Sequence, residues 1–306
     1  MMFDKEKYGK ILVPMVTPFK EDQSVDYEAA VSIAEKLIDD NKADSIILSG
    51  TTGEFFTMDF EERVKLFKVI KEAVGNKIPL IAGTGCVSTI ETIALSKKAE
   101  ELGYELIMVV SPYYTRPTQD ELYNHFKKVA ESIKIQMTLY NIPIFTGVNI
   151  SPKILAKLSK IENIIAIKEE AELNPKQMTD FINVTPDNFV IYCGDDSMIL
   201  EAFAQGGSKR IGGIISGASH IIGVKLKNMI EMFLEGKVQE SAKAQQKYLP
   251  LFRSLGQNGR SNPCSLLKEA MKILDYNAGI PRLPLTPGTE EEIAEVKKVM
   301  KKLNII

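Results

Sequence analysis

Lys168 is the residue whose type and position in this sequence most clearly suggest covalent chemistry. It follows the apolar run 164–167, Ile-Ile-Ala-Ile, which is typical of a strand buried on both faces. An ammonium group loses its hydration at such a place, and this desolvation lowers the pKa of a lysine and frees its lone pair. The uncharged amine is the nucleophile that forms a Schiff base with a carbonyl compound. The alternative is a lysine that extends from the strand end into solvent.

Other short apolar runs also end in residues that suit binding or proton transfer. The segment 50–54, Gly-Thr-Thr-Gly-Glu, offers two glycines, two hydroxyls and free N–H groups that favour a carboxylate or phosphate. An ordinary turn with capping threonines explains it equally well. Tyr140 ends another run, where its phenol can donate and accept protons, unless the ring only packs in the core.

Three further run ends have weaker signals. Tyr113 and Tyr114 lie between prolines in a loop that suits an interface or a pocket wall. Asp195 and Asp196 could bind magnesium, but a cap for the following helix is the favoured interpretation. The glycine-rich run that ends at Ile215 would let a small ligand approach the backbone.

The elements that must position these residues are strands alternating with amphipathic helices. The predicted strands are Ile11–Val16, Ser45–Leu48, Leu80–Gly83, Leu106–Val110, Met137–Tyr140, Ile164–Lys168, Phe189–Tyr192 and Ile211–Ile215. The predicted helices between them are Asp26–Asp40, Asp59–Val74, Ser88–Leu102, Gln119–Ile133, Ser151–Leu158, Pro175–Val184 and Ser197–Gln205. Four more follow: Ile221–Glu235, Val238–Leu255, Ser265–Tyr276 and Thr289–Leu303.

Eight strand–helix units in sequence predict an α/β fold, a (β/α)8 or TIM barrel whose chemistry gathers at the carboxyl ends of the strands. We expect residues 1–222 to form the barrel and residues 223–306 to form a C-terminal helical extension packed on it or on a partner subunit. The alternative is an open doubly wound sheet. It is weakened because Pro14 and Pro18 follow the first strand, where a glycine-rich dinucleotide turn would lie.

Composition excludes several classes of function. The chain of 306 residues has 44% hydrophobic and 25% charged residues, as globular proteins do, and its net charge of −2 argues against a nucleic-acid partner. We expect no membrane partner, because no apolar run is long enough to span a bilayer and the start lacks the core of a signal peptide. The three scattered cysteines favour a cytoplasmic location. No His/Cys/carboxylate cluster has the spacing of a metal site, so we predict no metal.

Taken together, the motifs resemble a known family. GTTGE, SPYY, YNIP followed by TG, the lysine of IKE, and GDD occur in the order typical of pyruvate-dependent class I aldolases, the dihydrodipicolinate synthase and N-acetylneuraminate lyase family. The similarity runs from Val13-Pro14 to Arg282-Leu283-Pro284-Leu285, essentially the whole chain. Each motif alone is weak, and the set is specific.

The resemblance implies a role for six residues. Lys168 would form a Schiff base with pyruvate or another 2-oxo acid, Tyr140 would move protons at the reacting carbon, and Thr51 would be its hydroxyl relay partner. Thr52 would hold the 2-oxo acid carboxylate, and Ile215 would contact pyruvate through its backbone. Tyr114 would reach into a neighbouring subunit, which implies a homotetramer, a dimer of dimers. The imine on Lys168 would replace any cofactor.

One departure bears on the second substrate. Dihydrodipicolinate synthases usually carry an arginine two positions after YN-x-P, which binds the carboxylate of the aldehyde substrate. Phe145 lies at that position here and cannot form a charge-assisted pair, although Arg116 could in principle substitute. Our leading hypothesis from the sequence is therefore a lyase that cleaves or forms a 2-oxo-3-deoxy sugar acid with pyruvate as product or donor. Dihydrodipicolinate synthesis from pyruvate and aspartate semialdehyde is the alternative within the family, with a decarboxylating or dehydrating member behind it.

Two other classes stay open. A non-catalytic barrel that binds 2-oxo acids would trap pyruvate without turnover. A barrel for phosphorylated substrates would use GTTGE as its anion site.

Overall fold

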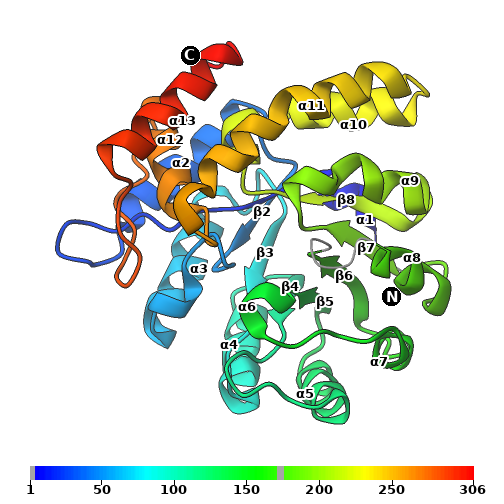
Figure 1. The fold of residues 1–306 in the computed structure, drawn as a ribbon. Helices are drawn as coiled ribbons and strands as arrows, with labels where there is room; N and C mark the ends of the chain where they lie inside the picture. The colour runs from blue at the N-terminus through cyan, green and yellow to red at the C-terminus, as the bar shows by residue number, and fades with distance from the viewer. Residues whose placement is uncertain (1–3, 171–175) are drawn as a thin grey trace. The chain divides into compact units, whose positions relative to one another are not determined.

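The computed structural model describes residues 4–170 and 176–306. Within them, eight strands join in the order β1 to β8 into one closed barrel, with helices between successive strands (Figure 1). The predicted (β/α)8 barrel is confirmed, and an open sheet is excluded because the barrel closes. The strands are β1 (Ile11–Pro14), β2 (Ser45–Leu48), β3 (Leu80–Gly83), β4 (Leu106–Val110), β5 (Gln136–Asn141), β6 (Ile164–Glu169), β7 (Val190–Cys193) and β8 (Ile211–Ile215).

The helices follow the predicted ranges to within a few residues in most cases. Those up to β8 are α1 (Lys5–Tyr8), α2 (Tyr27–Asp39), α3 (Phe60–Val74), α4 (Thr89–Glu101), α5 (Gln119–Glu131), α6 (Pro143–Thr146), α7 (Pro152–Leu158), α8 (Gln177–Val184) and α9 (Ile199–Arg210). Those after β8 are α10 (Ser219–Leu234), α11 (Val238–Leu255), α12 (Cys264–Ile273) and α13 (Glu290–Lys302). Pro175, the predicted start of α8, lies outside the described residues. None of the helices in the described ranges has the length and apolar content to cross a membrane.

Local sequence explains where several helices begin. Asp59 caps α3 by accepting a hydrogen bond from the Glu62 N–H, and the Glu62 side chain accepts one from the Asp59 N–H, as their spacing predicts. The helix predicted from Ser197 begins differently. A 3-10 turn, Asp196–Met198, precedes α9, because the Asp195 carboxylate binds the Ser197 N–H and holds the chain in a tighter turn.

The Cα positions divide the chain into two compact units. Unit 1 comprises the chain up to Lys10 and Leu80–Ile215, and unit 2 comprises Ile11–Pro79 and Ser216–Ile306. The predicted domain boundary at residue 222 falls inside α10, so the division into a barrel and an extension stays a prediction.

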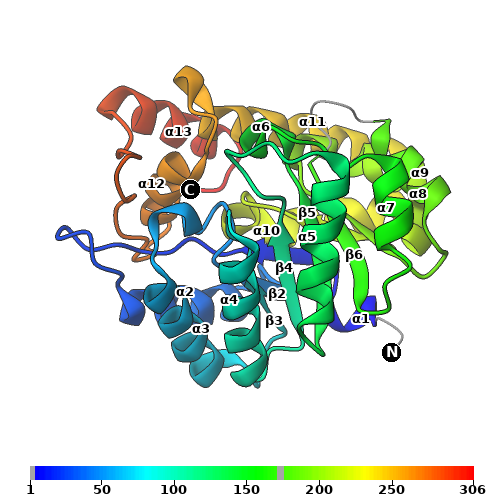
Figure 2. The ribbon, with the colours of Figure 1, turned by 90° about the horizontal axis from the view of Figure 1, so that it is seen from below.

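In unit 1, helices flank the outer side of the strands. Figure 1 shows α4, α5, α7 and α8 outside β4 to β7, and Figure 2 shows α4, α5 and α7 running alongside the strands. The β5–β6 pairing contains one irregularity. Met137 pairs with Ile164 but Thr138 pairs with Ala166, so Ile165 is an extra residue in β6. Beyond it, Tyr140 pairs with Lys168 and Asn141 pairs with Glu169.

In unit 2, α2 packs against α3, and the C-terminal helices pack on one another. Helix α11 contacts both α10 and α13, and α13 also contacts α12. The core of this helical group is apolar, with Leu226, Met229, Leu251, Leu267 and Val296 fully buried.

Candidate active site

Lys168 and Tyr140 meet on one face of the sheet in unit 1. The register of β5, β6 and β7 places Tyr140, Lys168 and Tyr192 side by side, and aligned residues of parallel strands point to the same face. The Lys168 Nζ donates a hydrogen bond of 3.1 Å to the Tyr140 Oη and lies 4.2 Å from the centre of its ring. Lys168 is only 5% exposed, so its amine does not extend into solvent.

The charge state of Lys168 differs from the one expected of a buried lysine. Burial lowers the pKa of the amine, but the Tyr140 phenol oxygen and the Glu170 carboxyl oppose this effect and together hold the pKa above its ordinary value. This direction is opposite to the one expected from desolvation alone, and it means that the resting amine holds its proton more tightly. A protonated amine cannot attack a carbonyl carbon, so a base must first remove a proton from Nζ.

Glu170 is a second acidic group at this amine, and none of the sequence motifs pointed to it. Its Oε2 lies 3.8 Å from the Lys168 Nζ, and its side chain is 16% exposed. Burial is the main cause that raises the pKa of Glu170 to about 8; Lys168 opposes this effect, and the nearby Asp195 and Asp196 add to it. The signal available in the sequence was spacing, since residues two apart at a strand end point to the same face.

The opposite face of the same strands carries a buried network of amides around Glu169. The Asn141 Nδ2 and the Gln177 Nε2 donate hydrogen bonds of 2.9 Å to the two carboxylate oxygens of Glu169. Both amides also bond to Asn149, whose own Nδ2 donates to the Gln177 Oε1 at 2.7 Å. Burial raises the pKa of Glu169 to about 7. The network ties the ends of β5 and β6 to α8 and so fixes the strands that carry Tyr140 and Lys168.

Two loops of unit 1 carry the remaining residues that the resemblance singled out. Tyr114 has a φ of 71° and is 91% exposed, so its ring has almost no cover within this chain. Phe145 is 38% exposed in α6. Arg116 lies against the turn that follows α6, because its Nε would be 3.1 Å from a Cβ built on Gly147. The Arg116 guanidinium group therefore lies against a residue that is two positions after Phe145 in the sequence.

The GTTGE segment in unit 2 forms a tight turn held by a buried ion pair. The Gly53 and Glu54 N–H groups donate to the Gly50 and Thr51 carbonyls at 3.0 Å. Glu54 adopts a left-handed conformation, with a φ of 56°, and its carboxylate accepts hydrogen bonds from the Lys268 Nζ at 2.5 Å and the Arg282 N–H at 2.8 Å. Neither Glu54 nor Lys268 is exposed. Glu54 is thus a structural group, and Thr51 and Thr52 are the half-buried members that can face a ligand.

Of the six predicted site residues, the structure brings Lys168 and Tyr140 into direct contact. Thr51 and Thr52 lie in unit 2, and their approach to Lys168 stays a prediction. Ile215 is the last residue of β8 and is buried, and its contact with a ligand also stays a prediction. Asp195 caps the turn before α9, so the interpretation as a cap holds for that residue.

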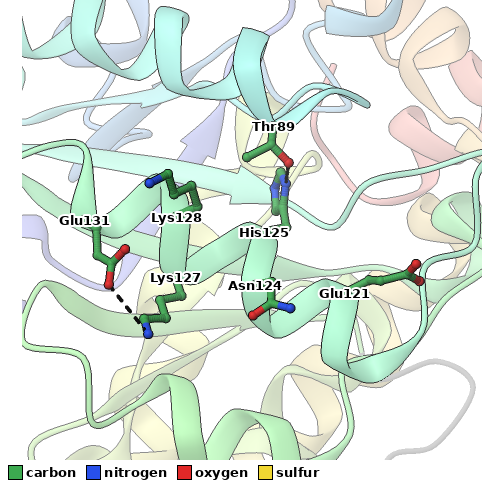
Figure 3. A pocket seen from close by; sticks show the side chains of 7 residues that line it. All are labelled: Thr89, Glu121, Asn124, His125, Lys127, Lys128 and Glu131. Carbon is green, nitrogen blue, oxygen red and sulfur yellow. Dashed lines mark hydrogen bonds and ion pairs between the residues drawn. The ribbon is translucent and has the colours of Figure 1, made fainter.

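A surface hollow of about 470 Å³ lies elsewhere in unit 1. Figure 3 shows its lining on α5 and at the start of α4, where the His125 Nδ1 lies 2.9 Å from the Thr89 Oγ1. Burial lowers the pKa of His125 to about 4, so the ring is neutral. The charged lining residues are two lysines and two glutamates, whose charges cancel. The hollow contains none of the predicted site residues, and we do not assign the chemistry to it. Its lining residues are Thr89, Glu121, Asn124, His125, Lys127, Lys128 and Glu131.

Comparisons with known proteins agree with the resemblance. Residues 7–303 match the family model described as the dihydrodipicolinate synthetase family. A 4-hydroxy-tetrahydrodipicolinate synthase of Desulforudis audaxviator is 39% identical over 98% of this chain and 99% of its own. A crystal structure of dihydrodipicolinate synthase from Bacillus anthracis superposes with a TM-score of 0.90 at 38% identity and covers 98% of this chain and 99% of its own. That of the Acinetobacter baumannii enzyme, described as chloride-inhibited and complexed with pyruvate, has a TM-score of 0.89 at 31% identity and covers 98% of this chain and 100% of its own.

Proposed function

The chain belongs to the dihydrodipicolinate synthetase family and is thus a class I pyruvate-dependent lyase, and we propose that it condenses pyruvate with aspartate semialdehyde. Relatives that are 37% to 41% identical over at least 93% of this chain are named 4-hydroxy-tetrahydrodipicolinate synthase. These names favour the synthase over the sugar-acid lyase that the sequence placed first. The observation that carries the chemistry is the 3.1 Å contact between the Lys168 Nζ and the Tyr140 Oη.

Lys168 is the group that would bind pyruvate covalently. A protonated imine withdraws electrons from the neighbouring methyl carbon, which can then lose a proton and become an enamine. The enamine carbon attacks the aldehyde carbon, and the new alkoxide takes up a proton. This attack forms the iminium again, and water or the amino group of the substrate then displaces the product from Lys168. Tyr140 is placed for these proton transfers, because its phenol oxygen already lies within hydrogen-bond distance of the nitrogen that carries the imine. No cofactor takes part in this proposal.

Arg116 supplies the positive charge that Phe145 lacks. Aspartate semialdehyde carries a carboxylate, and a guanidinium group binds a carboxylate through charge-assisted hydrogen bonds. The Arg116 side chain lies against Gly147, two residues beyond Phe145, so it reaches the same loop from the neighbouring segment. Replacing Arg116 with alanine should raise the KM for aspartate semialdehyde by about 10-fold to 100-fold, the cost of one such bond. The KM for pyruvate should stay unchanged.

The sugar-acid lyase remains the second candidate, and two features near Lys168 and in α6 are compatible with it. Phe145 presents a ring that is 38% exposed, and an acidic group, Glu170, lies at Lys168. Both features suit an uncharged, hydroxyl-bearing aldehyde, because Phe145 offers no charge to an anion and Glu170, mostly protonated below its pKa of about 8, can exchange hydrogen bonds with hydroxyl groups.

One assay separates these candidates. The purified protein is mixed with pyruvate and either aspartate semialdehyde or glyceraldehyde, and consumption of pyruvate is followed by NMR. We expect kcat/KM to be at least about 100-fold higher for aspartate semialdehyde, as for a site with a polar partner for each substrate group. A preference for glyceraldehyde would move the assignment to the sugar-acid lyase. Reduction with borohydride in the presence of pyruvate should add the mass of one reduced pyruvate to Lys168. Trapping without turnover of any aldehyde would instead indicate a binding protein.

The resemblance also assigns roles in binding and proton relay that we carry forward as proposals. Thr51 would pass protons to Tyr140, Thr52 would hold the pyruvate carboxylate, and Ile215 would contact pyruvate through its backbone. Replacing Thr52 with valine should weaken trapping at low pyruvate concentration, because the hydroxyl is lost while the shape is kept. Unchanged trapping would remove Thr52 from the site.

Tyr114 suggests how the chains assemble. A tyrosine that is 91% exposed, on a backbone held at positive φ, suits burial against another subunit better than a role in its own chain. We therefore keep the homotetramer, a dimer of dimers, as a proposal that sedimentation velocity tests. A fully active monomer would contradict it. All three cysteines lie in the described part of the chain, none of them forms a disulfide bond, and two are buried, which supports a cytoplasmic location that cell fractionation would test.

A further inference from the structure

We propose that Glu170 is a catalytic acid–base residue, which removes a proton from Lys168 and returns it to the departing oxygen during imine formation. This inference rests on the imine at Lys168 in the proposed function. It adds a group that lies 3.8 Å from the reacting nitrogen and that neither the motifs nor the contact between Lys168 and Tyr140 identifies.

The backbone at Gly194 lets the two side chains converge. A Cβ built on Gly194 would lie 2.6 Å from both the Glu170 Oε2 and the Lys168 Cε. Cβ atoms in proteins essentially never come this close to another heavy atom. The carboxyl oxygen and the last carbon of the lysine therefore occupy the space that a side chain at position 194 would fill. The result is the separation of 3.8 Å between the Glu170 Oε2 and the Lys168 Nζ. Only glycine at position 194 permits this arrangement.

The neighbouring Glu169 cannot take this role. It points to the opposite face of β6, and its two carboxylate oxygens already accept hydrogen bonds from Asn141 and Gln177. In contrast, the Glu170 Oε2 lies 3.8 Å from the Lys168 Nζ.

The charges around Glu170 adjust its affinity for a proton. From β6 it is faced by Lys168, and from the end of β7 and the following loop by Cys193, Asp195 and Asp196, while Glu169 acts on it through its charge from the opposite face of β6. The acidic neighbours and burial raise the pKa of Glu170, while Lys168 lowers it, and the result is a value of about 8. A base is most effective when its pKa lies near the working pH, because it can then both take up and release a proton.

The proton balance of imine formation needs such a group. The resting amine carries three protons, and one passes from Nζ to the Glu170 carboxylate. The lone pair then forms the N–C bond as the carbonyl π bond breaks, and the oxygen takes the second proton from nitrogen. Glu170 returns the first proton to this hydroxyl, the C–O bond breaks, and water leaves. An ammonium and a ketone thus become a protonated imine and water, with the net charge unchanged.

A rapid-quench experiment tests this role. The full chain is mixed with pyruvate, quenched with borohydride at increasing times, and the reduced adduct on Lys168 is measured by mass spectrometry. Wild type is compared with Glu170→Gln, with Glu170→Asp, and with Glu131→Gln on the surface of α5 as the matched control. Circular dichroism establishes that each variant is folded.

The direction of the change is decisive, because a purely electrostatic role predicts the opposite result. If Glu170 only keeps Lys168 protonated, its removal lowers the pKa of the amine and imine formation becomes faster. The acid–base role predicts that Glu170→Gln forms the imine about 100-fold more slowly at pH 8.5, with the same final amount of adduct. Glu170→Asp should recover part of the rate, and Glu131→Gln should match wild type. A rate for Glu170→Gln that is equal to or above that of wild type overturns the proposal.

The pH profile of wild type provides a second measurement that needs no variant. The rate of imine formation should rise with pH and level off above about 8, as the Glu170 carboxyl loses its proton. In Glu170→Gln this inflection should be absent. A wild-type profile without an inflection between pH 7 and 9 also overturns the role of Glu170. If wild type forms no adduct on Lys168 at all, the proposed function itself fails. If wild type and Glu170→Gln both form the adduct and do so equally fast, only the role of Glu170 fails.

Discussion

The buried pair between Glu54 and Lys268 yields the sharpest prediction about stability. Both side chains are completely inaccessible to solvent, and Lys268 reaches from α12 to the turn that carries Thr51 and Thr52. Replacing Lys268 with methionine keeps the volume of the side chain but leaves the Glu54 carboxylate buried without its counter-ion. Removing one partner of a buried pair costs about 3 to 5 kcal/mol. The Ile280 carbonyl also loses its 2.8 Å hydrogen bond from Lys268, which adds about 1 kcal/mol.

The expected loss for Lys268→Met is therefore about 4 to 6 kcal/mol, measured as the free energy of unfolding in urea at pH 7.5. This is a large part of the 5 to 15 kcal/mol that keeps an ordinary domain folded. Lys272→Met is the matched control, because Lys272 lies on the same helix but is 36% exposed and pairs with Glu269 near the surface. We expect it to cost less than about 1 kcal/mol.

A double variant completes the test. Glu54→Leu combined with Lys268→Met removes both charges, so no uncompensated ion remains. Its loss should be at least about 2 kcal/mol smaller than the sum of the two single losses, because the main penalty of each single variant is the partner left behind. The Arg282 N–H and the Ile280 carbonyl still lose their partners, so recovery should be incomplete. A loss below about 1 kcal/mol for Lys268→Met, or strict additivity in the double variant, would refute the reasoning.

Three other outcomes are expected. Tyr140→Phe should still form the pyruvate adduct on Lys168 but should lower kcat for condensation by about 100-fold to 10,000-fold, because the phenol hydroxyl is lost; wild-type kcat would contradict the role of Tyr140. Gly194→Ala should destabilise the protein by about 1 to 3 kcal/mol in urea and slow adduct formation, since the new methyl group would displace Lys168 or Glu170; unchanged stability would mean that the loop moves freely. Glu169 binds its proton more tightly in the folded than in the unfolded chain, with a pKa of about 7 against 4.5, so it stabilises the fold below pH 4.5 and this contribution is lost as pH rises to 7. The loss is about 3 kcal/mol at about 1.4 kcal/mol per pKa unit. Relative to wild type, Glu169→Gln should lack that decline when urea unfolding is compared at pH 5 and pH 7.5, and a parallel decline would show that another group causes it.

The sequence was sufficient for elements whose signals are local. The strand at 164 and the capping box of Asp59 and Glu62 were predictable because apolar runs and caps involve residues a few positions apart. The first strand was predicted too long, since it ends at Pro14 in the structure. The predicted helix ended at Gln205, whereas α9 continues to Arg210 across a break at Gly207. The break was not predicted, because a positive φ, here 55°, leaves no periodic signal in the sequence.

The parts of the site that were missed depend on contacts between distant residues. Glu54 and Lys268 are 214 positions apart, and Gln177 reaches Glu169 from a different element, so neither partner is visible in a local pattern. The direction of the Lys168 pKa shift was predicted wrongly for the same reason. Desolvation can be inferred from the surrounding apolar run, but the opposing effect comes from where Glu170 and the Tyr140 phenol lie in space.

The extra residue Ile165 in β6 determines which of two neighbouring side chains lies beside the Tyr140 phenol. If Ile165 paired with Thr138 in regular register, every later residue of β6 would shift by one position against β5, so that Tyr140 would pair with Ile167 and Asn141 with Lys168. Alternate residues of a strand point to opposite faces, so the amine would then leave the face of the phenol, and an apolar side chain would take its place. The chemistry at Lys168 thus depends on an insertion in the backbone three residues away, and a change that restored regular pairing there would disable the site without altering any residue in it.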